Sequence, residues 1–285
     1  MNVTINSSLM SLLQAASGSS SGDPVLTALY GINGQPGSRP QNPILAMQLA
    51  EQNKTKEIAT TAKEPLIARD IAAFSVAVTA AKDPAALLKN PAVMKVLLTA
   101  NGLADQLSYT GLARKALVSN VNDPKALVNQ LTDTRWKTVV QTYDFANRGL
   151  SILQNPKVIR TLADAYAEVT WRKSLDAATP GLSNALSFRQ SAGSITSLDQ
   201  ILGDPILRKV ITTTLGIPEQ IAFQSLPTQE KAISSQIDIT KFRDPKFVES
   251  FTQRYLIAAG AKASTATRST PDLTMLAVKA QGLLV

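Results

Sequence analysis

Apolar residues recur at intervals of three and four along most of the chain from residue 43 onward. In the segment Glu64–Ala81, for example, Ile67, Ile71, Phe74 and Val78 fall on one face of a helix. The same spacing continues in the segments 133–150 and 156–178, and a new segment starts at Pro180. Alternation of apolar and polar residues, which indicates half-buried strands, is not sustained anywhere. The pattern predicts an all-α fold of about ten or eleven helices with no substantial sheet.

Asp-Pro and Asn-Pro pairs mark the beginnings of the predicted helices. An Asp or Asn side chain accepts a hydrogen bond from an unpaired backbone N–H at a helix start, and Pro fits the first helical position. Such pairs begin at Asn42, Asp83, Asn90, Asp123, Asn155, Asp204 and Asp244. Each pair therefore predicts a helix start. Thr270-Pro271 and Ile217-Pro218 predict two more, the latter with a weaker cap.

One of these capped segments occurs twice. NPAVMKVLLTANGL (90–103) matches DPILRKVITTTLGI (204–217) at a constant offset of 114 residues. In both copies a Gly stands where a helix needs a left-handed terminating residue. A second pair, residues 121–136 and 242–257, matches in the same order. We therefore predict a degenerate internal repeat of two helical lobes, residues 43–150 and 151–262, that share one core.

The two ends of the chain differ from this helical body. Residues 1–42 are rich in Ser, Gly and Asn, which predicts a flexible arm, and residues 263–285 read as a polar link followed by an amphipathic helix. Both ends carry apolar side chains that are candidate partner contacts: Leu9, Leu12, Leu13, Leu273, Leu276 and Leu284. We hypothesise that these end segments pair with each other or with a partner in an assembly.

Composition narrows the chemistry that the chain offers. There is no Cys, which removes thiolates, disulfides and most zinc sites, and no His, which removes the commonest general base and metal ligand. No phosphate-binding loop and no calcium loop is present. We therefore expect no cofactor, no metal and no enzymatic activity. No run of residues is apolar enough for a membrane span, and the N-terminus lacks the basic region of a secretory signal.

Several charged and polar residues need individual assessment. A Ser–Lys dyad would need an activated serine, but Ser119, Ser174 and Ser191 stand near basic residues only as any serine in a basic chain would. Asp164 and Glu168, with Arg172 beyond them, read as a surface charge row with one ion pair. The net charge of +8 raises the alternative of an anionic partner, and basic residues flank Trp136 and Trp171. We interpret both Trp side chains as core residues with Arg and Lys at the edge of the core.

Two longer runs resemble a known family. Residues 99–145 contain a Gly-Leu-x-Asp turn, an Asp-Pro, and the stretch LTDTRW; residues 184–218 contain a Phe-Arg helix, the stretch ILGD and a Leu-Gly-Ile-Pro close. In these motifs, over about residues 64–258, the chain resembles the alphaproteobacterial family called domain of unknown function 1217. Trp136 stands where this family usually has Tyr. The resemblance implies a flagellar context, because members are typically encoded among flagellar genes, and it implies no catalytic or binding residues.

These observations favour a non-enzymatic, flagellum-associated structural or protein-interaction component. Export by the flagellar apparatus fits the lack of Cys, the Ser- and Asn-rich N-terminus and the apolar C-terminal segment, which many exported flagellar subunits share. One alternative is a cytoplasmic helical adaptor or regulator of flagellar assembly. Another is a basic binder of nucleic acid or anionic surfaces. We expect protein partners of the flagellum rather than nucleic acid.

Overall fold

Helices and their connecting loops make up the whole of residues 42–269, the part of the chain that this computed structural model describes. Ten of the α-helices in this range have seven or more residues, and no strand occurs in it. The predicted all-α class is therefore confirmed, and the number of full-length helices agrees with the ten or eleven expected from periodicity.

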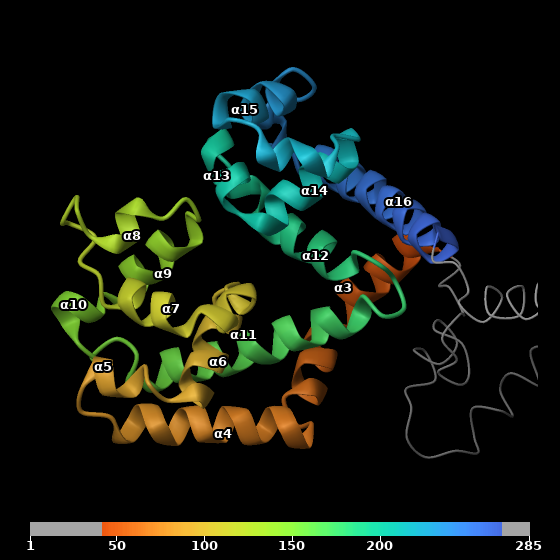
Figure 1. Cartoon of the computed structure of the whole chain (residues 1–285). Helices are drawn as coiled ribbons and strands as arrows, with labels where there is room; N and C mark the ends of the chain where they lie inside the picture. The colour runs from red at the N-terminus through yellow and green to blue at the C-terminus, as the bar shows by residue number, and fades with distance from the viewer. Residues whose placement is uncertain (1–41, 270–285) are drawn as a thin grey trace, which may run out of the picture.

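The helices form two groups, which Figure 1 shows at the lower left and the upper right. The first group comprises α4 (Pro65–Ala80), α5 (Pro84–Leu87), α6 (Pro91–Ala100), the 3-10 helix η1 (Ala104–Tyr109), α7 (Thr110–Leu117), α8 (Leu127–Gln130), α9 (Arg135–Tyr143) and α10 (Phe145–Arg148). The second comprises α12 (Leu182–Ser191), η2 (Ala192–Ser194), α13 (Leu198–Gly203), α14 (Pro205–Leu215), η3 (Glu219–Phe223), α15 (Leu226–Ser234), η4 (Ile239–Arg243) and α16 (Pro245–Ser269). We call these groups the first and second lobe.

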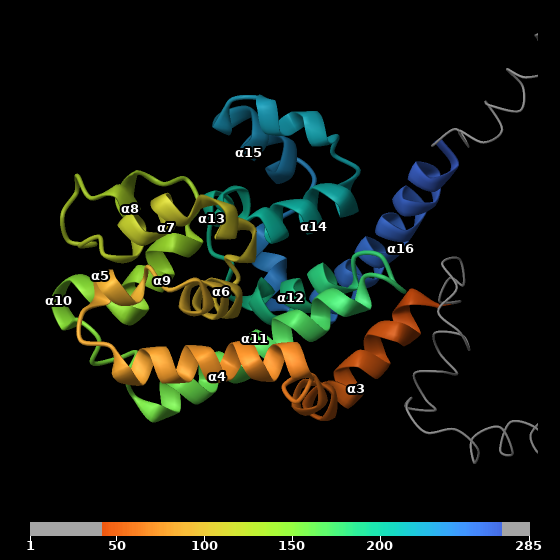
Figure 2. The same ribbon diagram turned by 60° about the horizontal axis from the view of Figure 1, so that its bottom comes forward.

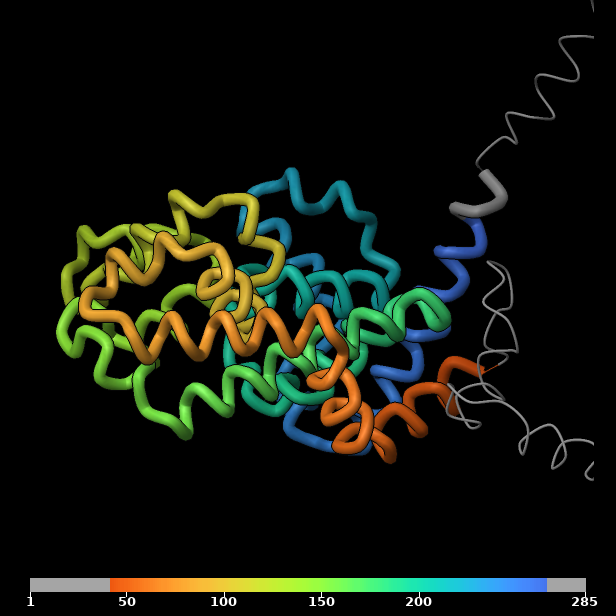
Figure 3. Tube along the Cα trace, turned by 90° about the horizontal axis from the view of Figure 1, so that it is seen from below, coloured from red at the N-terminus to blue at the C-terminus, as the bar shows by residue number. Residues whose placement is uncertain are grey.

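Two long helices tie the lobes together. The helix α11 (Pro156–Leu175) runs from the first lobe into the second, and α3 (Pro43–Thr61) packs on both α11 and α16 (Figures 1 and 2). A helix of 20 residues is about 30 Å long, which is enough to cross a small domain. In the view from below, the described chain begins and ends on the same side of the molecule (Figure 3).

The buried residues form two clusters rather than the one shared core that the sequence led us to expect. The first contains Phe74, Leu97, Trp136 and their neighbours, and the second contains Phe188, Phe251 and theirs. The helix α11 contributes to both clusters because of its length, with Tyr166 in the first and Trp171 in the second.

The cores also divide the chain differently from the predicted lobe boundaries. Ala46, Met47 and Ala50 of α3 are buried in the second core, although their sequence position placed them in the first lobe. Conversely, Leu162 of α11 is buried in the first core. Along the described residues, α3 packs in the second core, the helices after it form the first lobe, and the helices from α12 onward pack in the second core again. Sequence spacing alone does not reveal this order.

Most of the predicted helix starts are confirmed. Helices begin directly after Asn42, Asp83, Asn90, Asn155, Asp204 and Asp244. In the repeated segment the side chains of Asn90 and Asp204 each accept hydrogen bonds from the second and third residues that follow. Gly102 and Gly216 both have a positive φ, 74° and 67°, as predicted for left-handed caps. The local match is therefore close, while an overall likeness of the two lobes stays a prediction.

Asp123-Pro124 is an exception, because it forms a turn instead of starting a helix. The carboxylate of Asp123 accepts the backbone N–H of Lys125 at 2.9 Å, and its carbonyl accepts the N–H of Ala126 at 2.9 Å. The side chain of Asn129 also donates to the Asp123 carbonyl. These bonds close the turn, and the short helix α8 begins only after it.

The segment 133–150, predicted as one helix, is broken at Asp144. This residue has a left-handed φ of 45° and ends α9, and α10 begins at Phe145. The rings of Tyr143 and Phe145 stack with their centroids 5.8 Å apart, and both are buried. Residues two apart on a continuous helix point in nearly opposite directions, so the break allows both rings to enter the core.

The predicted polar link after residue 262 is wrong up to residue 269. The helix α16 continues to Ser269, and the hydroxyls of Ser264 and Thr265 donate to backbone carbonyls of the preceding turn. The arm 1–42, except its last residue, and the C-terminal segment from residue 270 lie outside the described residues.

Candidate functional site

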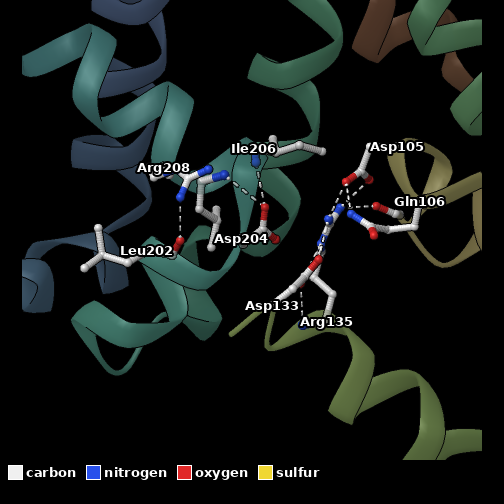
Figure 4. A network of polar contacts seen from close by, with 10 residues as sticks. Asp105, Gln106, Asp133, Arg135, Leu202, Asp204, Ile206 and Arg208 are labelled. Carbon is white, nitrogen blue, oxygen red and sulfur yellow. Dashed lines mark hydrogen bonds and ion pairs between the residues drawn. The ribbon is translucent and has the colours of Figure 1, made fainter. Parts of the chain in front are cut away.

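A pocket of about 310 Å³ lies between the two lobes. Its first wall comes from the end of α6 and the start of α9, and its second wall comes from the segment between the end of α12 and the first turns of α14. The residues that give it polar character include Asn101, Arg135, Ser191, Gln200 and Asp204. Figure 4 shows the two polar networks that flank this region, one centred on Arg135 and the other on Asp204.

Arg135 is the centre of the network on the first lobe. Its side chain is only 10% exposed, and its guanidinium contacts two carboxylates. Asp105 accepts two of its N–H groups at 3.0 and 2.9 Å, and Asp133 accepts its Nε at 3.0 Å and its Nη2 at 2.7 Å. A further N–H donates to the carbonyl of Gly102. Arg135 therefore joins the α6 cap, η1 and the start of α9.

We call Arg135, Asp105 and Asp133 the clamp, because the guanidinium joins the two carboxylates. The pKa values of Arg135 and Asp105 agree with a structural role for it. Burial alone would lower the pKa of Arg135, but the hydrogen bonds and charges of Asp133 and Asp105 outweigh it, and the pKa is raised. Burial likewise opposes ionisation of Asp105, yet the guanidinium lowers its pKa. Arg135 and Asp105 therefore both stay charged near neutral pH, and the guanidinium is a hydrogen-bond donor to both carboxylates.

The polar groups of the facing wall are also engaged. Asp204 accepts the backbone N–H groups of Ile206 and Leu207 at 2.8 and 3.2 Å, which caps α14, and Arg208 donates to the carbonyl of Leu202 at 3.2 Å. Gln200 completes a capping box at the start of α13. Because these groups hold the fold in place, the interlobe pocket presents few free polar atoms to a ligand.

A buried carboxylate lies deeper in the first lobe. Asp70 of α4 accepts the hydroxyl of Tyr166 at 2.8 Å and forms an ion pair with Lys95 of α6, while Arg69 approaches it at 3.4 Å. Burial opposes ionisation of Asp70, but the hydrogen bonds from Lys95 and Tyr166 outweigh it and lower its pKa. Asp70, Lys95 and Tyr166 thus link α4 and α6 of the first lobe to α11, which joins the two lobes.

A third network lies where α11 enters the second lobe. Glu168 pairs with Arg172 and with Lys54 of α3, the latter at 2.7 Å, and Arg172 also donates to Gln190 at 2.7 Å. The predicted ion pair between Glu168 and Arg172 is present, but it is not part of a surface row, because Arg172 is buried. Burial lowers the pKa of Arg172, although Glu168 opposes this effect.

The serines considered for a dyad donate hydrogen bonds to backbone carbonyls three or four residues earlier in the chain. Ser119 donates to Lys115, Ser174 to Trp171 and Ser191 to Ser187, at 3.0, 2.7 and 3.0 Å. These contacts are typical of hydroxyls on helices. Nothing in this geometry activates a serine.

The two Trp residues are buried, as expected. Trp136 lies in the first core and Trp171 in the second. Arg135, which we expected at the edge of the core, is partly buried and pairs with Asp105 and Asp133. Arg114 and Lys115 of α7 are exposed.

The candidate partner contacts at Leu9, Leu12, Leu13, Leu273, Leu276 and Leu284 lie outside the described residues. Within residues 42–269, no cluster of acidic side chains has the arrangement of a metal site. In the same range, no helix combines the length and the apolar character that a bilayer crossing requires.

Comparison with known sequences gives the family. The sequence profile of the family described as "Protein of unknown function (DUF1217)" matches residues 100–248, more than half of the chain. The chain belongs to this family. The DUF1217 match includes the clamp residues Asp105, Asp133 and Arg135 and both copies of the left-handed Gly cap. No similar protein was found among the curated proteins.

A solved structure supports the fold. The chain is similar to the crystal structure of Protein AGR_C_984 from Agrobacterium tumefaciens, with a TM-score of 0.64 and 23% sequence identity. The likeness covers 79% of this chain and 97% of that chain. At this level of identity it shows that the two proteins share a fold.

Proposed function

We propose that this protein is a non-enzymatic, flagellum-associated component that works by binding other proteins. The proposed association with the flagellum rests on membership of the DUF1217 family, because the resemblance to this family implies a flagellar context. The binding part rests on one observation: Phe223, at the end of η3, is 89% exposed, and Leu226, at the start of α15, is 53% exposed. Large apolar side chains that gather at the surface are typical of interaction sites.

The arrangement of charged groups supports binding rather than catalysis. The most buried ionisable side chains of the described lobes, among them Asp70, Arg135 and Arg172, already pair with oppositely charged neighbours. A catalytic acid or base needs a pKa matched to its task and a free approach to substrate. Arg135 and Asp105 favour each other's charged form, and the guanidinium is bonded to two carboxylates, so the clamp suits a structural role.

The same pairing weighs against the anionic-partner alternative. Arg135 and Arg172 were two of the basic residues beside a Trp that suggested base stacking, and both are buried and paired with carboxylates. They therefore offer no positive charge to a phosphate backbone.

The positions of the chain ends support a role for the terminal segments in the same assembly. The described chain begins at α3 and ends at α16 on one side of the molecule (Figures 1 and 3). Both predicted partner-contact segments are thus covalently attached at that side, beyond residues 42 and 269. We propose that they engage flagellar partners there, with export by the flagellar apparatus as the route.

A paired variant tests the exposed apolar site. Replacing Phe223 and Leu226 together by Ser should leave stability nearly unchanged, because surface substitutions usually stay within about 0.5 kcal/mol. The tagged variant should no longer co-purify with flagella and basal bodies. Val76→Ser is the matched control, since Val76 is a 70% exposed apolar residue on α4. Co-purification of the double variant at the wild-type level would contradict the proposal.

A further inference from the structure

A second pocket, of about 360 Å³, lies in the second lobe between α12, α14, η3 and α16. Four charged side chains line it: Asp176, Lys209, Glu219 and Lys262. Glu219 forms an ion pair with Lys262, and Asp176 accepts the backbone N–H and the hydroxyl of Ser183. Among the described residues, Lys209 alone of these four has neither an ion pair nor a side-chain hydrogen bond.

Lys209 occupies the same place in α14 that Lys95 occupies in α6. Each lysine stands five residues after the N-cap of its helix, Asp204 in one case and Asn90 in the other. Each helix has Pro at its first position and ends at a left-handed Gly. Lys95 and Lys209 therefore extend from equivalent turns of α6 and α14.

The neighbours of the two lysines also correspond. In the first lobe α4 and α11 pack on α6 and supply Asp70 and Tyr166; in the second lobe α12 and α16 pack on α14 and supply Asn184 and Tyr255. Asp70 precedes Lys95 by 25 residues, and Asn184 precedes Lys209 by the same number. In the first lobe the Tyr166 hydroxyl lies beside Lys95, and in the second lobe Tyr255 and Lys209 line the same pocket.

One group differs between the two places. The carboxylate of Asp70 accepts from both Lys95 and Tyr166 and completes the first site. In the second site the equivalent residue is the neutral Asn184, whose Nδ2 donates to the Tyr255 hydroxyl at 3.2 Å. The second site therefore keeps the lysine and the tyrosine but has no acid at the position equivalent to Asp70. The two carboxylates that also line its pocket are held by other partners, Asp176 by Ser183 and Glu219 by Lys262, and Glu219 interacts with Lys209 only through its charge.

We propose that this pocket binds the carboxylate group of a ligand, with Lys209 and Tyr255 as its donors. The Tyr255 oxygen already accepts the Asn184 amide, so the hydroxyl hydrogen is directed to another acceptor. Burial raises the pKa of Tyr255, and the hydroxyl keeps its proton at neutral pH. Charge-assisted hydrogen bonds of this kind are the stronger ones in proteins. The volume accommodates a small organic acid or one acidic side chain.

Binding of a carboxylate in this pocket is independent of the proposed flagellar role, and an NMR titration of the full chain tests it. Succinate is titrated into the ¹⁵N-labelled protein, and the side-chain amide of Asn184 and the backbone amides of Gly181 and Thr213 are followed by NMR. We expect saturable shifts with succinate and none with succinamide, which has the same shape without the charge. N-acetylglutamate N-methylamide, which mimics a Glu side chain in a protein, serves as the second probe. Tighter binding of succinate indicates a free organic acid as the ligand, and tighter binding of the second probe indicates an acidic side chain.

Two variants remove the site in different ways. Lys209→Met removes the ammonium, and Asn184→Asp supplies an internal carboxylate that pairs with Lys209; each should weaken succinate binding at least tenfold. The matched control is Lys173→Met, an exposed lysine of α11, which should bind as the wild type does. Unchanged circular dichroism shows that each variant is folded. Equal shifts with succinamide, or wild-type binding by both folded variants, would overturn the proposal.

Discussion

Replacing Arg135 by Met should destabilise the protein more than any surface Arg substitution. Met keeps much of the length and apolar volume of the side chain but removes every N–H donor. The change leaves Asp105 and Asp133 facing each other without the cation between them, and it frees the carbonyl of Gly102. The α6 cap, η1 and the start of α9 then lose the group that joins them.

The size of this effect follows from the burial of the clamp. Removing one partner of a buried ion pair costs about 3–5 kcal/mol, because the other charge stays uncompensated. The side chain of Asp105 is 44% exposed, so water screens part of that cost. We therefore expect a loss of about 3 kcal/mol in the free energy of unfolding. For a protein of this size that corresponds to roughly 6–12 °C in Tm.

Urea unfolding followed by circular dichroism and Trp fluorescence measures this loss, since both Trp residues are buried and report on the two cores. Arg160→Met is the control, because Arg160 is exposed on α11. The guanidinium lowers the pKa of Asp105, so the stability that this carboxylate contributes is present above about pH 4, its unfolded value, and is lost as pH falls further. The difference between wild type and variant should therefore shrink as the pH falls below about 4. A loss no larger than that of the control, or one that is the same at pH 7 and pH 3, would refute the reasoning.

Three further substitutions test other parts of the structure by the same unfolding assay. Trp136→Ala should cost about 3–5 kcal/mol, because the ring is 1% exposed and its removal leaves a cavity in the first core; a cost below about 1 kcal/mol would contradict that burial. Gly181→Ala should cost about 1–3 kcal/mol, since φ is 85° and a Cβ there would stand 2.9 Å from the Cβ of Ala259, whereas Gly193→Ala, with open space around it, should cost much less. Asp70→Asn should cost about 1–3 kcal/mol at pH 7. Because the pKa of Asp70 is lowered, this cost should fall as the pH drops below about 4, and a cost independent of pH would count against the ion pair.

Periodicity and caps predicted the local structure well, because both depend on residues close in sequence. The stripe of Ile67, Phe74 and Val78 is buried, and the left-handed glycines stand where the repeated segment placed them. The failures arise where tertiary contacts decide. Asp144 takes a left-handed conformation so that the rings on either side of it both reach the core.

The division into two cores could not be predicted from the sequence, because it too depends on tertiary contacts. The apolar face of α3 has helical spacing whichever lobe it packs on, and only the folded chain shows that Met47 belongs to the second core. Likewise the length of α11 is readable from sequence, but its passage from one core to the other is not.

The polar sites were mostly missed by sequence reasoning. Asp70 falls within the apolar stripe of α4, three residues after Ile67 and four before Phe74, and that position was a signal that it is buried. Lys95 and Lys209 match in the repeated segment, yet Asp70 and Asn184, the residues that decide how the two sites differ, lie 25 residues earlier, outside the matched stretch. The clamp around Arg135 joins residues that are about 30 positions apart, which no local pattern indicates.

The association with the flagellum is tested most directly by fractionation. The tagged full chain is followed through sheared filaments, purified hooks with basal bodies, and cytosol, in strains with and without a working flagellar export gate. The account predicts that the protein is found with the filament, hook or basal body, and that this signal is lost when the gate is absent. Protein confined to the cytosol in both strains would contradict it and would favour a cytoplasmic adaptor of assembly.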